Sequence, residues 1–324
     1  KKNLFLRHPH SGEDMTETMT LVTPGCLGTC WHGKYHYLEP YCGCAHDCVY
    51  CYAKSRPAVK AKLSELKTEF QNPVPMLPES ELLNRIKDAA CSGDLKIVKL
   101  SRFTDIFSPP FDTNGLAFKI LETLAASKVG RIIITTKGAP SPETIALISA
   151  NKEKFSYNVV AKPDCGLKFE KNVPPLEQRL KAAGQLCASG VKTTIHFDPL
   201  VPGFEDRPEM LNPLLDRLAA HGLKRVMFSY LLLNAKILAA MRTELGDAFA
   251  ERLVSEFDSK EIQMLPNQED TFYASMKPAL KDKSVRTIAA LLEKKGFDFV
   301  LCSLKSGRNA AACGSKLCDG SFYA

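Results

Sequence analysis

The chain has 324 residues, of which 45% are hydrophobic and 24% are charged, so it can bury a sizeable core as a globular protein. It contains no uninterrupted apolar run of about 18 residues, which argues against a membrane span and predicts a cytoplasmic protein with no membrane partner. The net charge of +7 is compatible with a polyanionic partner, but the densest basic stretches, 54–67 and 277–286, are interpreted as solvated helix faces.

Strands and helices are predicted to alternate along the chain after a polar segment that ends at about Thr18. Runs of β-branched and apolar residues predict strands, whereas 3.6-residue periodicity with proline starts and glycine stops predicts helices. We expect, in chain order, a strand over 34–38, a helix from about 52, a helix over 79–91, a strand over 96–103, a helix over 116–127, a strand over 131–136, a helix over 141–150, a strand over 155–161, a helix over 174–189, a strand over 191–197, a helix over 208–221, a strand over 224–230, two more helices, and a strand over 297–302.

Strands separated by helices of about 10 residues or more are typical of parallel βαβ units. The predicted fold class is α/β, a partial (β/α)6 TIM-type barrel built from six core units. Its functional site is then expected at the C-terminal ends of the strands. We expect residues 34–301 to form this barrel, with 1–33 as an N-terminal extension and 302–324 as a C-terminal tail, both bearing cysteines.

Cys44, Cys48 and Cys51 form a C-x₃-C-x₂-C motif after the first predicted strand. This loop can bind three corners of a [4Fe–4S] cluster and leaves the fourth iron without a protein ligand, whereas most clusters have four cysteines. The amino and carboxylate groups of S-adenosylmethionine (SAM) can chelate the open iron. An electron from the cluster then releases a 5′-deoxyadenosyl radical, which is chemistry of the cofactor. A zinc knuckle completed by His46 or Cys42 is the alternative interpretation.

Several residues near predicted strand ends are candidates for binding SAM or substrate. Lys137 follows a strand, where its cation suits a carboxylate. Thr104 and Asp105 either bind ribose hydroxyls or cap the next helix. Tyr50 either flanks the adenine or packs in the core. Asp198 precedes a proline and is either a turn former or a substrate contact.

The cysteine motif resembles that of the radical SAM superfamily and, within it, the spore photoproduct lyase-like branch. The resemblance implies a partial barrel of the radical SAM kind, in which Lys137 holds the SAM carboxylate and Arg179 lies against SAM. Phe103 departs from the branch, which carries a hydrogen-donor cysteine at this point, so the same thiol shuttle is not expected. The resemblance covers about 41–230, and its further segments are 100–109, 133–138, 175–183 and 194–203.

The other cysteines gather near the two ends of the sequence, in part within glycine-containing turns. Such turns suit a second, auxiliary iron–sulfur cluster, with a zinc site or no metal as the alternatives. The preferred ligand set is Cys26, Cys30, Cys313 and Cys318, with Cys302 as the first substitute. Three isolated cysteines are expected to be small buried side chains, namely Cys91, Cys165 and Cys187.

The sequence therefore predicts a radical SAM enzyme that abstracts hydrogen from an organic substrate. A peptide is the preferred substrate, because auxiliary clusters resemble those of peptide-modifying relatives. Nucleic-acid lesion repair or modification is the alternative, favoured by the positive charge. A non-catalytic iron–sulfur electron-transfer protein is the alternative from another class. The expected partner is an electron donor such as flavodoxin or ferredoxin.

Overall fold

A nine-stranded, mostly parallel sheet forms the centre of the computed structural model, which describes residues 18–25, 35–264, 272–305, 316–318 and 320–322. Every hydrogen-bonded pair within this sheet is parallel except the first, in which β1 runs antiparallel to β2. The order across the sheet is β1 (Val22–Pro24), β2 (His36–Leu38), β5 (Ile97–Leu100), β6 (Arg131–Thr136), β7 (Phe155–Val160), β8 (Lys192–Leu200), β9 (Arg225–Tyr230), β12 (Asp298–Cys302) and β13 (Leu317–Cys318).

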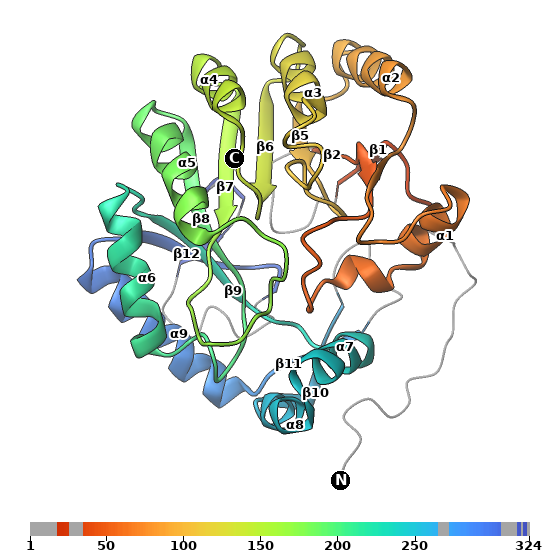
Figure 1. Ribbon diagram of the computed structural model, residues 1–324. Coiled ribbons are helices and arrows are strands. Elements are labelled where there is room, and N and C mark those ends of the chain that lie inside the picture. The colour runs from red at the N-terminus through yellow and green to blue at the C-terminus, as the bar shows by residue number, and fades with distance from the viewer. Residues whose placement is uncertain (1–17, 26–34, 265–271, 306–315, 319, 323–324) are drawn as a thin grey trace.

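Helices cover the outer side of this sheet as an arc (Figure 1), so the α/β partial barrel predicted from the sequence is confirmed. None of the described helices is long and apolar enough to cross a bilayer. The covering helices are α2 (Glu79–Cys91), α3 (Leu116–Ala125), α4 (Pro142–Ala150), α5 (Leu176–Ala188), α6 (Pro208–Ala220) and α9 (Pro278–Lys294).

The alternation of side chains along the strands separates the core from the barrel interior. On β6, Ile132 and Ile134 are fully buried in the large core cluster that includes the covering helices. The alternate residues face the other way: Ile133 packs within the interior cluster, and Thr135 lines the interior cavity. The same alternation directs Lys137, which directly follows β6, into that cavity.

The cysteine segment lies on the open side of the arc, between a short β-ladder and a helix (Figure 1). The predicted helix from about 52 is interrupted, because Arg56 precedes a proline and takes the extended conformation, with φ −70° and ψ 131°. The elements here are β3 (Tyr41–Cys42), paired with β4 (Val74–Pro75), the 3₁₀ helix η1 (Tyr52–Ser55) and α1 (Pro57–Glu65).

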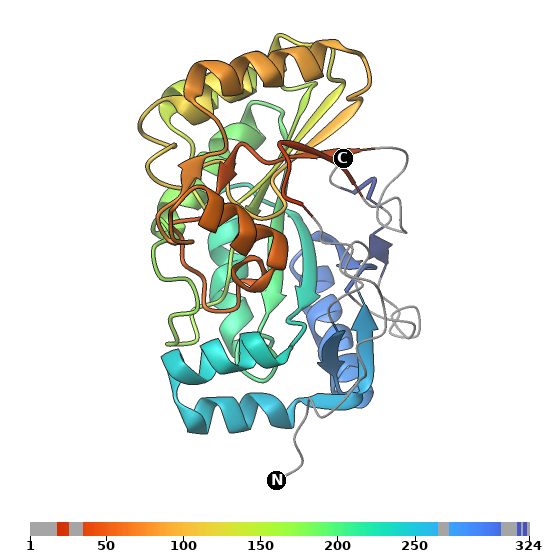
Figure 2. The ribbon, with the colours of Figure 1, turned by 90° about the vertical axis from the view of Figure 1, so that its right-hand side faces the viewer.

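The C-terminal part contains more elements than the sequence predicted. Three helices follow β9 rather than two, and an antiparallel hairpin precedes the last of them. Figure 2 shows α7 and α8 at the end of the molecule opposite to α2. The elements added are α7 (Ala235–Leu245), α8 (Asp247–Ser255), β10 (Phe257–Met264) and β11 (Phe272–Met276).

Candidate functional site

The three motif cysteines, Cys44, Cys48 and Cys51, line a single cavity of about 330 Å³ at the C-terminal ends of the strands. The loop that carries them is held by a hydrogen bond from the Cys44 N–H to the Phe70 carbonyl, 2.7 Å long. Gly43 precedes this bond with φ +90°, and a Cβ built there would lie 2.6 Å from the same carbonyl oxygen. The loop therefore requires glycine both for its backbone conformation and for the close approach.

Burial disfavours the charged form of Cys44 and Cys48. It raises the pKa of Cys48 to about 12 and the pKa of Cys44 further, so the thiolates need nearby positive charge to form. The irons of a bound cluster would supply that charge. Among the described residues, no three His, Cys, Asp or Glu side chains are arranged to hold a single metal ion. The cysteines of an iron–sulfur cube bind different irons, so they need not converge on one point.

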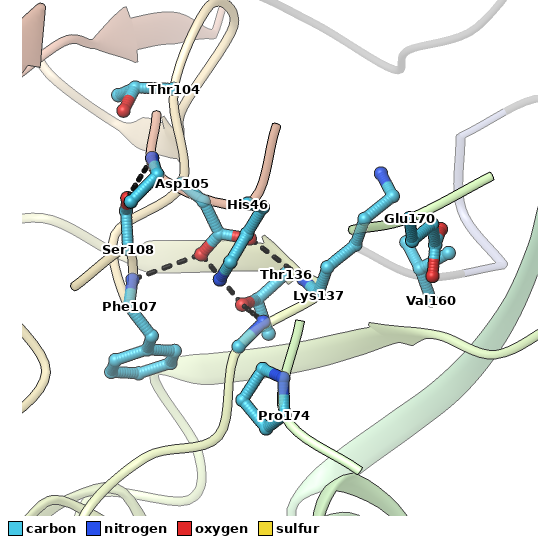
Figure 3. Close-up of polar contacts among 12 residues, drawn as sticks. His46, Thr104, Asp105, Phe107, Ser108, Thr136, Lys137, Val160, Glu170 and Pro174 are labelled. Carbon is cyan, nitrogen blue, oxygen red and sulfur yellow. Dashed lines mark hydrogen bonds and ion pairs between the residues drawn. The ribbon is translucent and has the colours of Figure 1, made fainter. Parts of the chain in front are cut away.

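Asp105 joins the cysteine loop to the end of β6 (Figure 3). Its carboxylate accepts hydrogen bonds from Thr136 Oγ1 at 2.7 Å, from the Lys137 N–H at 2.7 Å and from the Phe107 N–H at 2.9 Å. It also lies 3.4 Å from His46 Nδ1 in the cysteine loop. Burial alone would raise the pKa of Asp105, but His46 and the hydrogen bonds outweigh burial and lower the pKa to about 2. The carboxylate thus positions two walls of the cavity.

Thr104 and His46 complete this attachment. The Thr104 hydroxyl donates to the Gly43 carbonyl at 2.5 Å, and the His46 carbonyl accepts from the Asn172 N–H at 3.1 Å. His46 is therefore a hydrogen-bonding residue of the loop. Thr104 and Asp105 both line the cavity and both bind protein groups, and their predicted contact with SAM stays a prediction.

Lys137 presents its ammonium group to the cavity. Figure 3 shows its side chain extending away from Asp105, which binds only its backbone N–H. Its Nζ lies 5.7 Å from the centre of the Tyr50 ring, and the described residues give it no hydrogen bond or ion pair. Burial would lower the pKa of Lys137, but the negative charges of Cys48 and Glu170 outweigh burial and raise it. The cation is thus retained and available to an anionic ligand.

Arg179 does not line the cavity and lies next to residues that do. Its guanidinium donates to the carbonyls of Val160, at 2.5 Å, and Pro174, at 3.1 Å, and lies 3.8 Å from a carboxylate oxygen of Glu170. Glu170 in turn accepts the hydroxyl hydrogen bond of Tyr50, whose ring lines the cavity. Arg179 therefore supports the position of Tyr50 through Glu170, and its direct contact with SAM stays a prediction.

The sequence did not reveal a buried ion pair between Lys162 and Glu205, whose charged atoms lie 2.9 Å apart. The ammonium of Lys162 lies 4.3 Å from the centre of the Tyr50 ring. Burial raises the pKa of Glu205 to about 7, although Lys162 and the Val201 N–H act to lower it. Only Lys162 could have been noticed from the sequence, because it directly follows a predicted strand, as Lys137 does.

The outer half of the cavity carries further cations, contributed by β5, its following loop and the segment after β12. Lys99, Arg102 and Lys305 line it. The Arg102 guanidinium lies 5.8 Å and the Lys99 ammonium 5.9 Å from the centre of the Tyr37 ring. This part of the cavity is therefore suited to an anionic ligand with a flat group.

Asp198 lies at the same part of the cavity and accepts hydrogen bonds from Ser229 and Lys305. Burial would raise its pKa, but Lys305 and Ser229 outweigh burial and lower it. Phe103 also lines the cavity, at the position where the sequence noted the missing thiol. Asp198 is thus a cavity residue, and its contact with a substrate stays a prediction.

Two of the cysteines predicted for an auxiliary cluster lie side by side in the described structure. Cys302 of β12 pairs in register with Cys318 of β13, and both are buried in one interior cluster. Cys302 also lines the main cavity. Cys42 lies elsewhere, with its Sγ 4.0 Å from the Val59 carbonyl. The other predicted ligands, Cys26, Cys30 and Cys313, lie outside the described residues.

The prediction that three isolated cysteines are buried was wrong. Cys91 is exposed at the end of α2, and Cys165 and Cys187 are only partly buried. Cys91 is the last residue of its helix, where the periodic apolar face no longer meets the sheet. Its position is also unsuited to replacing the thiol missing at Phe103, since it does not line the cavity.

The fold and cavity define a parallel-stranded α/β protein with three cysteines and a lysine ammonium group in one cavity at the carboxyl ends of its strands. The chain belongs to the radical SAM superfamily, whose family model matches residues 38–212, more than half of the chain. It is 27% identical over 187 residues to the uncharacterized proteins Mb2609c of Mycobacterium bovis and Rv2578c of Mycobacterium tuberculosis. The match covers 56% of this chain and 54% of each relative, so the chain spans about half the length of these relatives.

Solved structures of spore photoproduct lyase share the fold. A complex with dinucleoside spore photoproduct is 14% identical, with a TM-score of 0.59, and the match covers 82% of this chain and 75% of that one. A mutant with bound AdoMet and the same dinucleoside gives 13% identity and a TM-score of 0.58 at the same coverage. At this identity the likeness supports the fold, and the superfamily implies a [4Fe–4S] cluster and SAM.

Proposed function

We propose that the chain holds a [4Fe–4S] cluster at Cys44, Cys48 and Cys51 and binds SAM with its carboxylate at Lys137. When bound, these groups supply a 5′-deoxyadenosyl radical that abstracts hydrogen from an organic substrate. The observation that carries the proposal is that the three thiols and the Lys137 ammonium line one cavity. The residues present fit both groups, because the buried thiols need cationic partners and the ammonium makes no ion pair with a described side chain.

The balance of buried charges beside Tyr50 supports a carboxylate ligand. Three cations, Lys137, Lys162 and Arg179, surround two carboxylates, Glu170 and Glu205. The ion pairs use Lys162 with Glu205 and Arg179 with Glu170. Lys137 is left for the incoming ligand, and its cation is stabilised when an anion reaches it.

The experiment is anaerobic reconstitution with iron and sulfide, followed by dithionite and SAM. We expect release of 5′-deoxyadenosine from the wild type and from Cys91→Ala, and none from Cys48→Ala. Cys91 is the matched control because it is an exposed cysteine outside the cavity. An intact cluster in the wild type without 5′-deoxyadenosine would reject the enzyme and favour a non-catalytic electron-transfer protein.

A peptide is the substrate class that we propose first. This choice depends on the presence of an auxiliary cluster, as in peptide-modifying relatives. Support comes from Cys302 and Cys318, which are neighbours on one sheet face, with Cys302 at the cavity. Iron should remain after Cys44, Cys48 and Cys51 are changed to alanine, at about four per chain. It should fall when Cys302→Ser and Cys318→Ser are added. Iron near zero in the first variant would remove the auxiliary cluster.

Nucleic acid is the second candidate, favoured by the cations Lys99, Arg102 and Lys305 in the outer half of the cavity. Phosphates bind such groups, and a base can stack on an aromatic side chain such as Tyr37. Oligonucleotides should then increase 5′-deoxyadenosine formation, and Lys99→Gln should remove the increase. Peptides that give the same increase in both proteins would favour the first candidate instead.

A further inference from the structure

A second recess, of about 220 Å³, lies beside the cysteine loop and has exposed side chains in its lining. We call it the lysine recess, because Lys54, Lys60 and Lys236 line it together with Cys51 and Ile237. Cys51 and Ile237 also line the main cavity. Cys51 therefore lies between the main cavity and the lysine recess.

The recess is formed by segments that are far apart in the sequence. Lys54 belongs to η1 and Lys60 to α1, whereas Lys236 belongs to α7. Figures 1 and 2 both show α7 beside the η1–α1 segment. The Lys236 ammonium donates to the Ser55 carbonyl at 3.4 Å, which joins the two sides. The surface is thus built on secondary structure rather than on a loop alone.

Positive charge dominates around this opening. Lys54 and Lys171 both pair with Asp47, and Lys171 also lies 2.6 Å from Glu244. Lys60 and Lys236 are exposed and make no ion pair with a described residue. The three lysines of the recess and Lys171 therefore outnumber the two carboxylates that pair with them, Asp47 and Glu244, and this leaves a net positive charge at the surface.

We propose that the lysine recess is the docking surface for an acidic protein that donates single electrons, a flavodoxin or a ferredoxin. The inference rests on the proposed function and adds the place where the donor binds. One electron passes from the reduced donor to the cluster held at Cys51, so the donor is oxidised by one electron and the cluster is reduced by one. No bond is formed or broken and no proton is moved in this step.

The position of the recess distinguishes this partner from a nucleic-acid substrate. None of its three lysines lines the main cavity, whereas Lys99, Arg102 and Lys305 do. A substrate must reach the radical inside the cavity, but an electron donor needs only to approach a cluster ligand from outside. Transient electron-transfer contacts are small and rely on complementary charge, as a compact group of surface lysines provides.

The test uses the reconstituted holoenzyme and oxidised flavodoxin. The double variant Lys60→Glu/Lys236→Glu should weaken binding by about tenfold or more at low salt, because charge reversal changes both attraction and encounter rate. The difference should shrink between about 0.05 M and about 0.5 M salt, as screening shortens the reach of each charge. The matched control is Lys128→Glu/Lys181→Glu, which changes the net charge equally at exposed positions beyond α3 and on α5.

Two chemical readouts separate the docking surface from the function itself. With dithionite, the double variant should release 5′-deoxyadenosine at the wild-type rate, since the small reductant needs no docking surface. With reduced flavodoxin, the rate should fall by about tenfold in the double variant and stay unchanged in the control. Equal flavodoxin binding by all three proteins overturns the proposal. Loss of oligonucleotide binding with unchanged flavodoxin binding also overturns it, in favour of a nucleic-acid surface. Absence of dithionite-driven cleavage in the wild type would instead reject the function.

Discussion

Replacing Asp105 by asparagine tests the connection between the cysteine loop and β6. The Asp105 side chain is buried and accepts three hydrogen bonds in addition to its contact with His46. Asp105→Asn preserves the size of the side chain but removes its charge and one accepting oxygen. The new amide hydrogens would face donors, the Thr136 hydroxyl or the Lys137 N–H. We therefore expect both loop positioning and stability to decrease.

The pKa of Asp105 gives the magnitude. A fall from 3.8 to about 2 in the folded state corresponds to about 2 kcal/mol of stability. Because the folded pKa is lowered, this stabilisation is complete well above the unfolded pKa of 3.8 and is lost as the pH falls toward 2. About 1 kcal/mol of it should disappear between pH 6 and about pH 3. The variant, which has no carboxyl group here, should not show this part of the pH dependence.

Urea unfolding of the cluster-free protein, followed by circular dichroism, measures the effect. At pH 6 we expect Asp105→Asn to lower the free energy of unfolding by about 2 kcal/mol or somewhat more. The difference from the wild type should narrow by about 1 kcal/mol at about pH 3. Asp88→Asn, at an exposed position of α2, is the control and should change little. A difference between wild type and Asp105→Asn that is the same at both pH values would refute the reasoning.

Three further predictions concern the same cavity. Gly43→Ala should destabilise the cysteine loop and reduce the iron content of the reconstituted protein. Gly93→Ala, the control, should lower the free energy of unfolding by about 1 kcal/mol without loss of iron. Both glycines have φ near +90°, but of the two only Gly43 would bring a Cβ against a carbonyl oxygen. Lys137→Met should weaken equilibrium binding of SAM by roughly tenfold to a hundredfold, the value of one charge-assisted contact, with the exposed Lys128→Met as control; equal affinities would exclude the contact. The free energy of unfolding of Glu205→Gln should rise relative to that of the wild type between pH 5 and pH 7, by on the order of 1 kcal/mol per pH unit. The reason is that the raised pKa of Glu205 stabilises the folded wild type below pH 4.5, and this stabilisation is lost as the carboxyl ionises. A constant difference in urea unfolding across this range would contradict the last prediction.

The strands were predicted well where both of their faces are buried. Residues 131–136 are β-branched after the first position, residues 155–160 contain two aromatic residues and two valines, and the structure has strands with nearly the predicted bounds. Burial by helices on one side and by the barrel interior on the other demands such composition. The hairpin of β10 and β11 was missed because β10 is largely polar and lacks the regular alternation that predicts a strand.

The roles of site residues were predicted less well than their positions. The sequence offered Asp105 as a ribose ligand or a helix cap, and the structure shows its carboxylate between the cysteine loop and β6. These partners come from residues 46, 136 and 137, so local pattern gives no indication of them. The pair of Lys162 and Glu205 was hidden for the same reason, since it joins segments separated by a helix and a strand.

Lys137 and Lys162 illustrate why a cation at a strand end does not identify a ligand-binding group by itself. Both follow neighbouring parallel strands, β6 and β7, and both lie near the ring of Tyr50. A carboxylate oxygen of Glu205 lies 2.9 Å from the Lys162 ammonium, whereas the described residues place no carboxylate within ion-pair distance of Lys137. The electrostatic difference arises from a residue beyond β8, which no pattern around either lysine contains. The proposal that Lys137 binds the SAM carboxylate is therefore supported by tertiary structure, because Lys162 has a carboxylate beside it and Lys137 makes no ion pair with a described residue.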